Sequence, residues 1–342
     1  MILITGARGT NGIEIVRLLA CSGVPCRAPV RNTQKAAALA ALPKFEIVGG
    51  DLARPETLAP AVEGVDKALL CSSIGPNLVE LQGNFIRAAK RAGVRHVVKL
   101  SGMDADLNSE WRFLRWHAEA ERELANSGLA FTHLQPNQFM QVYLRFQSTI
   151  ASQGKFYAAS KDSEVSPVDI REIAAVAVAV LTGSDHEGEK YVITGPEALT
   201  YSAVAEKLSE AIGKKVSYVD VPLATAKKTL LDGGAPEWFA EGQAEQIRFR
   251  WQGKQSRVTA TIAQVAKKKP ATFDEFAREH AGYFRDEETA VPTSMPSAHW
   301  TEPDRAPLEK ASKEEQNARR KGTVRQQVFE DPVGQSLAHH RH

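Results

Sequence analysis

In the first half of the chain, short apolar runs alternate with segments in which apolar residues recur every three or four positions. Residues 2–5 form such a run, and Ile13, Val16 and Leu19 follow at the spacing of one helix face. Parallel strands need crossovers of a dozen or more residues, which the helical segments supply. The alternation therefore predicts an α/β fold with a doubly wound parallel sheet. We expect strands at residues 2–5, 26–30, 45–48, 67–72, 96–100 and 130–134, and later helices at 33–42, 55–62, 78–92 and 109–127.

From about residue 150 the regular alternation ends, and short strand candidates mix with helical segments. We expect a smaller, mixed α/β portion that is intertwined with the first domain and packs against the carboxyl edge of its sheet. The predicted organisation is a domain over residues 1–150, the smaller portion over 151–285 and a tail over 286–342. The strand candidates in the second portion are 156–158, 164–167, 190–194 and 216–219, and its helices are 170–181, 201–212, 223–231, 236–250 and 272–283.

The last segment, residues 286–342, is poor in apolar residues and rich in proline and in charges of both signs. Such a composition cannot bury enough apolar surface to offset the entropy lost on ordering. We therefore expect a polar, disordered tail. His339, His340 and His342 indicate a solvated terminus rather than a metal site, and we expect no metal elsewhere.

The charge balance and the cysteine content narrow the classes of partner. The chain carries 43 Lys and Arg against 41 Asp and Glu, so no general attraction to nucleic acid or to an anionic membrane is expected. No apolar run reaches the roughly 18 residues that span a bilayer. Cys21, Cys26 and Cys71 are too few for a disulfide framework and are typical of a reducing compartment. We expect a cytoplasmic protein.

A glycine-rich turn follows the first strand and opens the first helix. Gly6, Gly9 and Gly12 recur at three-residue intervals there. Glycine allows a tight turn and lets the backbone approach a pyrophosphate, while the helix start offers free N–H groups and the positive end of its dipole. In this strand–turn–helix context the motif predicts a Rossmann-type dinucleotide site. Its expected contacts are Gly6, Ala7, Arg8, Gly9, Thr10, Asn11 and Gly12.

The end of the second strand indicates which dinucleotide is bound. An NAD site usually has Asp or Glu there to bind the ribose hydroxyls. This chain instead has Arg31, with Lys35 a turn later and Arg8 inside the glycine-rich loop. Guanidinium groups bind phosphate oxygens well, so the three cations favour a 2′-phosphate. We therefore expect NADP(H) in preference to NAD(H).

Other strand ends supply the rest of the expected cofactor channel, because ligands of open α/β sheets bind beyond the carboxyl ends of the strands. The third strand precedes a carboxylate that would border the adenine. The fourth and fifth precede hydroxyl groups that would line the ribose and nicotinamide. These candidates are Asp51, Leu52, Ser72, Ser73, Ile74 and Ser101, the last also a candidate catalytic residue.

Several motifs together resemble the NmrA-like branch of the atypical short-chain dehydrogenase/reductase superfamily. They are the loop at 4–12, the strand ends at 30–32 and 70–73, and the segments 117–121, 127–129, 135–141, 154–157, 168–174 and 194–200. The resemblance covers residues 1–285 and points to NAD(P)H azoreductases, triphenylmethane-dye reductases and type 2 quinone oxidoreductases. It implies further cofactor contacts at Pro136, Asn137, Gln138, Phe139, Met140 and Gln141.

The catalytic Tyr-x-x-x-Lys pair of typical superfamily members is missing from the expected helix at residues 109–127. Tyr157 and Lys161 have the right spacing but lie beyond the sixth strand, so we interpret them as an accident of a loop. In place of the pair the helix has His117 and Glu121, which share one face. His117 is a candidate proton donor, since its ordinary pKa is about 6.5, and an ion pair on the helix face is the alternative.

The segment after the sixth strand and two tryptophans would form the substrate pocket. Their apolar and aromatic side chains suit a flat acceptor, and packing between the two portions explains each of them equally well. The resemblance therefore predicts an NADPH-dependent reductase that transfers hydride to a planar quinone, azo or triphenylmethane acceptor. The alternative is a non-catalytic NADP(H)-binding redox sensor that acts through a protein partner; the oligomeric state stays open. The predicted pocket residues are Phe139, Met140, Tyr143, Trp111 and Trp116.

Overall fold

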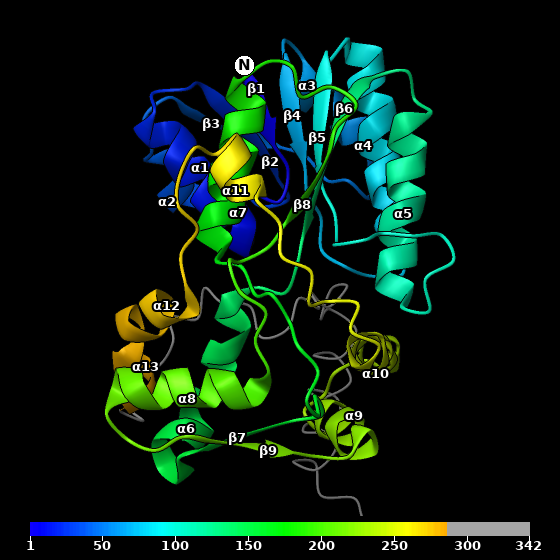
Figure 1. Ribbon diagram of the computed structural model, residues 1–342. Helices are drawn as coiled ribbons and strands as arrows, with labels where there is room; N and C mark the ends of the chain where they lie inside the picture. The colour runs from blue at the N-terminus through cyan, green and yellow to red at the C-terminus, as the bar shows by residue number, and fades with distance from the viewer. Residues whose placement is uncertain (286–342) are drawn as a thin grey trace, which may run out of the picture. The chain divides into compact units, whose positions relative to one another are not determined.

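Seven parallel strands form the main sheet of the computed structural model, which describes residues 1–285 apart from the side chains of residues 35, 37 and 38 (Figure 1). The strand order is β3-β2-β1-β4-β5-β6-β8, and every neighbouring pair is parallel. This order confirms the predicted doubly wound sheet. The strands are β1 (Ile2–Ile4), β2 (Cys26–Val30), β3 (Phe45–Gly49), β4 (Lys67–Leu70), β5 (His96–Leu100), β6 (Ala130–Pro136) and β8 (Lys190–Ile193).

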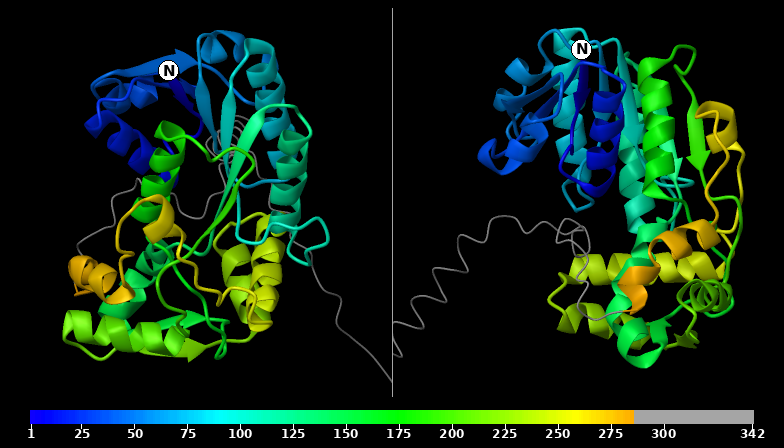
Figure 2. Two further views of the ribbon diagram at one scale, coloured as in Figure 1. Left: turned by 45° about the horizontal axis from the view of Figure 1, so that its top comes forward. Right: turned by 90° about the vertical axis from the view of Figure 1, so that its left-hand side faces the viewer.

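Helices cover both faces of this sheet (Figure 2). Successive residues of a strand point to opposite faces, so Leu3 packs in one apolar core while its neighbours Ile2 and Ile4 pack in the other. The core of Ile2 and Ile4 lies under α1 (Thr10–Cys21) and α7 (Ile170–Thr182). The core of Leu3 lies under α3 (Ala59–Val62), α4 (Leu78–Ala92) and α5 (Arg112–Ala125).

A third apolar core, around the buried Tyr143, Phe156 and Phe273, belongs to the later part of the chain. Two short parallel strands, β7 and β9, lie beside it, and helices surround it (Figure 1). These elements are β7 (Lys155–Ala158), β9 (Ser217–Asp220), η3 (Met140–Phe146), α6 (Gln147–Gln153), α8 (Tyr201–Ile212), α12 (Phe273–Glu279) and α13 (Ala281–Arg285). Helices α9 (Leu223–Asp232) and α10 (Glu237–Trp251) pack against each other, and α10 also contacts α5.

The later part of the chain also contributes to the main sheet. Helix α7 packs against α1, and β8 pairs with β6 at the edge of the sheet. The segment at 190–194, expected in the smaller portion, is therefore an edge strand of the large sheet. The division of the chain at residue 150 stays a prediction.

Some predicted elements differ in the structure. Residues 164–167 were expected to form a strand, but only an isolated bridge joins Val165 to Leu199. The reason is that neighbouring backbone groups bond to different segments: Ser166 N–H donates to the Gln255 carbonyl and Val168 N–H to the Gln138 carbonyl, so no ladder develops. Three short helices were not predicted, namely η3, α6 and α11 (Thr261–Val265). Two predicted helices each begin with a 3-10 turn, giving η1 (Gln34–Ala36) before α2 (Ala37–Ala40) and η2 (Pro55–Thr57) before α3.

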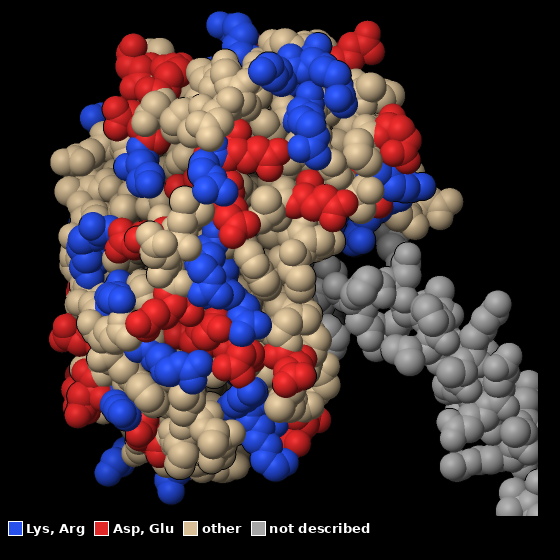
Figure 3. Space-filling model, turned by 90° about the vertical axis from the view of Figure 1, so that its right-hand side faces the viewer, with Lys and Arg blue, Asp and Glu red and all other residues tan. Residues whose placement is uncertain are grey.

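The structure bears on some of the predictions made from composition, namely those on membrane spans, cysteines and surface charge. Within residues 1–285 no helix is both long and apolar enough to cross a bilayer. Cys21, Cys26 and Cys71 are all free. On the face over α4 and α5, basic and acidic side chains are interspersed (Figure 3). The disorder predicted for residues 286–342 lies outside the described residues.

Candidate functional site

The glycine-rich loop links the end of β1 to the end of β4. The Thr5 hydroxyl donates to the Cys71 carbonyl at 2.8 Å and accepts from the Cys71 N–H at 2.7 Å. Gly6 then turns with a φ of +66°, and a Cβ there would lie 2.9 Å from the Cys71 carbonyl oxygen. A Cβ on Gly12 would lie 2.1 Å from the Gly6 carbonyl oxygen. Only glycine fits these two positions, because the backbone segments touch.

The start of α1 has the features of an anion-binding site. Its N-cap is Gly9, which provides no side chain to cap the first N–H groups. The Asn11 side chain is buried, and its Oδ1 atom has no hydrogen-bond partner among the described residues. Free N–H groups at a helix start attract phosphate. The glycine cradle and these free N–H groups therefore fit the pyrophosphate of a dinucleotide, whereas the Asn11 oxygen can only accept a hydrogen bond, for example from a hydroxyl group.

The predicted 2′-phosphate residues lie at the ends of β1 and β2, which are neighbours in the sheet. Arg8 and Arg31 are exposed, and neither forms an ion pair with another described residue. Lys35 lies in η1, and its side chain is outside the described part of the structure. No acidic residue follows β2 directly. The ends of these strands therefore present free guanidinium groups.

The predicted adenine contacts have partners within the protein. Asp51 accepts from the Ala53 N–H at 3.0 Å, and its other carboxylate oxygen lies 3.7 Å from Arg54. The Leu52 carbonyl accepts from Asn84 at 2.8 Å. These bonds shape the turn after β3, so contact with adenine stays a prediction.

Strands β4 and β5 are neighbours near the middle of the sheet, so their carboxyl ends lie side by side. Ser72 accepts from Gln82 at 3.0 Å, while Ser73 is exposed and Ile74 is half-buried. The Ser101 hydroxyl is buried, and its polar neighbour is the Glu121 carboxylate, whose pKa it helps to lower by a side-chain hydrogen bond. This hydroxyl lies at the end of a central strand, at the edge where ligands of this fold bind.

The loop after β6 is held by its own polar side chains. Asn137 donates to Ser166 and to the Gln255 carbonyl, both at 2.8 Å. Gln141 donates to Asp169 at 3.1 Å and accepts from the Ile170 N–H. These bonds fix the loop, from Pro136 to Gln141, between the two parts of the molecule. They occupy amides that were predicted to contact the cofactor, and those contacts stay predictions.

A buried arginine that the sequence did not single out anchors the same loop. Arg250 of α10 is 5% exposed and donates to Gln138 at 2.7 Å, to Tyr201 at 2.8 Å and to Gln255 at 3.2 Å. All three partners are neutral. Nothing in the helical pattern of residues 236–250 marks this position.

The predicted pocket residues fall into two groups. Tyr143 and Met140 are fully buried, and the Tyr143 ring packs edge-on against Tyr201 and Phe273. Packing accounts for both residues. Phe139 is half-buried at the loop after β6, and Trp111 and Trp116 are half-buried in an aromatic cluster between α5 and α10, where both pack against Phe113. These three retain exposed surface.

His117 and Glu121 share a face of α5 but have different partners. The His117 Nδ1 atom lies 3.2 Å from the Nζ atom of Lys99, a fully buried residue of β5. Glu121 instead accepts from Gln135 at 2.8 Å and lies 3.3 Å from His133 and 3.5 Å from Lys190. The predicted helix-face ion pair of His117 with Glu121 therefore does not form.

Burial and these contacts shift three pKa values. Burial and the Lys99 ammonium hold the pKa of His117 well below its usual range. Burial lowers the pKa of Lys99 to about 8, although the Glu121 carboxylate opposes this. Burial opposes ionisation of Glu121, yet hydrogen bonds from His133 and Gln135 lower its pKa to about 2. At neutral pH the helix therefore covers a neutral imidazole, an ammonium and a carboxylate.

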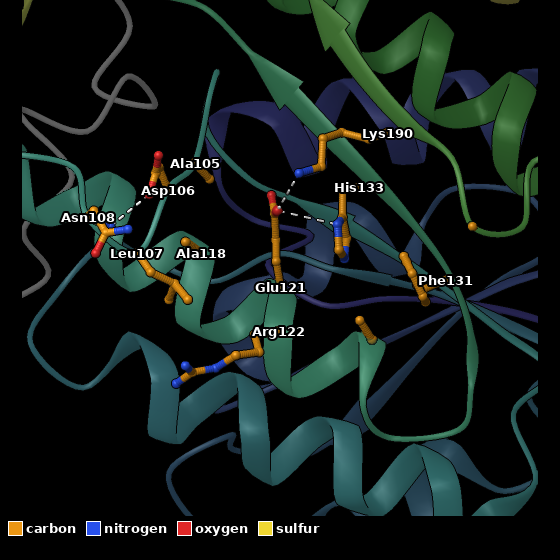
Figure 4. Close-up of a pocket in the computed structure, with 12 residues that line it drawn as sticks. Ala105, Asp106, Leu107, Asn108, Ala118, Glu121, Arg122, Phe131, His133 and Lys190 are labelled. Carbon is orange, nitrogen blue, oxygen red and sulfur yellow. Dashed lines mark hydrogen bonds and ion pairs between the residues drawn. The ribbon is translucent and has the colours of Figure 1, made fainter.

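A hollow of about 520 Å³ opens beside Glu121 (Figure 4). The side chains of Glu121, His133 and Lys190 point toward one another on its wall, and the loop with Asp106 and Asn108 lies across from them. The hollow contains none of the predicted cofactor residues. Among residues 1–285 no group of His, Cys, Asp and Glu side chains is arranged to hold a metal ion.

Tyr157 and Lys161 lie away from helix α5. Tyr157 is 41% exposed on β7 and donates to Gln153 at 2.8 Å. Lys161 follows in a left-handed turn with a φ of +50°, and its Nζ atom lies 3.8 Å from the centre of the Trp251 ring. The two residues therefore do not share a helix face as the Tyr-x-x-x-Lys motif requires, and the interpretation that they are not catalytic stays a prediction.

Comparison with known proteins finds relatives that match most of the chain. Residues 1–277 match the profile of the NmrA-like family. An NAD(P)H azoreductase of Xenophilus azovorans is 39% identical over 284 residues, which cover 83% of this chain and 99% of the azoreductase.

Two solved structures share the fold over a similar length. The NADPH-dependent quinone oxidoreductase of Escherichia coli in complex with NADPH has a TM-score of 0.76 at 29% identity, covering 82% of this chain and 99% of that chain. The triphenylmethane reductase of Citrobacter sp. in complex with NADP(H) has a TM-score of 0.74 at 26% identity, covering 82% and 100%.

Proposed function

The chain belongs to the NmrA-like family, and from this premise we propose that it is an NADPH-dependent reductase of planar electrophilic acceptors. Quinones, azo compounds and triphenylmethane dyes are the acceptor classes. The observation that carries the proposal is the glycine cradle at the switch point of the sheet, where the start of α1 has no side-chain cap and its N–H groups are free to bind phosphate. The 39% identity to an azoreductase over nearly its whole length supports the reaction class.

The cofactor lies across the carboxyl edge of the sheet. The backbone from Gly6 to Gly12 holds the pyrophosphate at the start of α1, and Asp51, Leu52 and Ser72–Ile74 line the adenine and ribose. The loop after β6, Pro136 to Gln141, borders the nicotinamide end, which supplies the hydride. In this arrangement residues 1–150 form the NAD(P)-binding domain and residues 151–285 the substrate side.

Preference for NADPH over NADH follows from the two free arginines. Arg31 and Arg8 bind the 2′-phosphate, assisted by Lys35. A guanidinium bonds phosphate oxygens through parallel N–H groups, which a 2′-hydroxyl cannot match. With no carboxylate directly after β2, the site also lacks the usual partner of NADH.

The acceptor lies against the nicotinamide, near the Ser101 hydroxyl and the Cδ2–Nε2 edge of His117. Phe139, Trp111 and Trp116 provide aromatic surface that suits a flat molecule. Met140 and Tyr143 support this wall from within the third core. Ser101 and His117 are the candidate catalytic residues.

The test is NADPH consumption by the purified protein with a panel of quinones, azo dyes and triphenylmethane dyes, with NADH in parallel. We expect turnover well above the enzyme-free rate, and faster with NADPH. Tight NADPH binding without turnover of any acceptor would contradict the reductase and favour a sensor that acts through a protein partner. Faster turnover with NADH would contradict the role of the two arginines in binding the 2′-phosphate, but not the reductase activity.

A further inference from the structure

A polar stripe runs under helix α5, inside an otherwise apolar sheet. Lys99 of β5 and His133 of β6 are register partners, so their side chains lie on the same face of the sheet. Ser101 and Gln135 continue this face toward the carboxyl edge. The stripe joins the hollow beside His133 to the strand end where the acceptor lies.

The Lys99 ammonium has no ionic partner within this stripe. It is 0% exposed, and its hydrogen-bond partners are the His117 Nδ1 atom at 3.2 Å and the Leu100 carbonyl at 3.5 Å. No carboxylate of residues 1–285 forms an ion pair with it. Burying an unpaired charge destabilises the fold, and an apolar side chain of the same size would fill this space at lower cost. The ammonium therefore calls for an explanation beyond packing.

The geometry of His117 gives that explanation. An ammonium can only donate, so Nδ1 of the neutral imidazole accepts from Lys99 and the ring proton lies on Nε2. His117 is half-buried, and its Cδ2–Nε2 edge faces the end of β5, where a Cβ on Gly102 would lie 3.3 Å from Cδ2 and 3.9 Å from Nε2. The donating nitrogen is thus directed toward the edge at which ligands of this fold bind.

We propose that Lys99 is the proton source of the reduction and that it acts through His117. This inference rests on the proposed reductase function. A quinone that has gained hydride is a hydroquinone anion, and its oxygen takes the Nε2 proton of His117. The Nδ1 atom then takes a proton from the Lys99 ammonium, so imidazole is neutral again in its other tautomer and Lys99 is a neutral amine. The relay replaces the proton donor that the absent Tyr-x-x-x-Lys pair provides elsewhere.

The groups that face Lys99 suit this exchange. Burial lowers its pKa to about 8, so it is charged at neutral pH and gives up a proton readily. The Glu121 carboxylate stays ionised and favours return of the proton, and burial raises the pKa of the nearby Cys71 thiol to about 11, so it stays neutral. His133, the strand neighbour of Lys99, lines the hollow (Figure 4), so one side chain separates this hollow from Lys99.

Two kinds of acceptor separate this role from a structural one. A quinone needs hydride and a proton, whereas a cationic triphenylmethane dye becomes its neutral leuco form by gaining hydride alone. Lys99→Met keeps the shape of the side chain and removes the ammonium. We expect its kcat for the quinone to fall roughly hundredfold, the usual size of general acid catalysis, and its kcat for the dye to change by less than about twofold. His117→Phe should behave alike, and the double variant should be no worse than either single one.

Lys67→Met is the matched control, because Lys67 is a lysine of the same sheet that donates to the Gly183 carbonyl, away from the carboxyl edge. It should leave the ratio of quinone to dye turnover unchanged. Equal losses with both acceptors in Lys99→Met, or an unchanged quinone rate, would overturn the relay. If the unmodified protein reduces neither acceptor, the proposed function itself fails.

Two measurements on the unmodified protein need no variant. In nuclear magnetic resonance of the cofactor-free protein, we expect the Lys99 side chain to titrate near pH 8 and His117 to carry its proton on Nε2. We also expect the quinone kcat to decline as the pH rises through about 8 while His117 stays neutral throughout. A His117 proton on Nδ1, or a quinone rate that does not respond to pH in this range, would overturn the proposal.

Discussion

The carboxyl edge of the sheet has two halves, one beside β1 and one beside β5 and β6. The backbone forms the site in the first half, and side chains form it in the second. Beside β1 the backbone forms the site, and two glycines allow chain segments to touch where a Cβ on Gly12 would lie 2.1 Å from a carbonyl oxygen. Beside β5 and β6 the site is made of buried charged and polar side chains, with Lys99, Glu121 and His133 almost fully buried. An added side-chain atom should therefore disrupt the first half, and the loss of a charged partner should disrupt the second.

The largest effect we expect is in the side-chain half. Glu121→Gln leaves His133 and Lys190 without their anionic partner, so the free energy of unfolding at pH 7 should fall by about 3 kcal/mol. The folded-state pKa of Glu121 lies below its unfolded value. The contribution of the carboxylate is therefore present above about pH 4.5 and is lost as the pH falls toward about 2.

Urea unfolding at pH 7 and pH 3 measures this difference, which should be smaller at pH 3. Glu123→Gln is the control on the same helix, because Glu123 pairs with Arg87 at the surface. It should cost less than about 1 kcal/mol. Equal losses in the two variants would contradict the distinct character of the buried half.

In the backbone half, Gly12→Ala should weaken NADPH binding roughly 10- to 100-fold. The added Cβ collides with backbone that cannot move aside, and such overpacking costs about 1–3 kcal/mol. Fluorescence titration with NADPH measures the change. Gly282→Ala is the control, because among residues 1–285 nothing lies within 4 Å of a Cβ placed there. Unchanged affinity in Gly12→Ala would mean that the cradle does not hold the cofactor.

An exposed side chain at the same half should matter less. Arg31→Glu removes a charge-assisted bond to the 2′-phosphate, so the ratio of kcat/KM for NADPH to that for NADH should fall about tenfold. Arg91→Glu, an exposed arginine on α4, should leave the ratio unchanged. An unaltered ratio in Arg31→Glu would show that the 2′-phosphate is bound elsewhere.

The smallest effect is expected outside both halves. Tyr157→Phe removes a hydroxyl whose partner is the exposed Gln153, so kcat with any acceptor should change by less than about twofold. Steady-state rates with a quinone check this. A loss of several orders of magnitude would mean that Tyr157 reaches the acceptor after all.

The difference between the two halves also explains which parts of the site can be predicted from the sequence. The glycine cradle is local, since Gly6 and Gly12 lie six positions apart on one turn, and its pattern therefore predicts both fold and cofactor. The spacing of His117 and Glu121 predicts their shared helix face but not their partners, because these come from β5 and β6. Lys99 does have a signal in the sequence, because it interrupts an apolar run in a central parallel strand, where a buried charge is unusual. Arg250 left none, since an arginine is ordinary on a helix.

The most direct test of hydride transfer uses NADPH deuterated at C4 of the nicotinamide and a cationic triphenylmethane dye. The hydride ends on a carbon atom of the leuco dye, where it does not exchange with water. We expect mass spectrometry of the product to find one deuterium per molecule, and none when unlabelled NADPH is used in deuterated water. A leuco dye that takes its hydrogen from water, or no leuco dye at all, would contradict the assignment of this protein as a reductase.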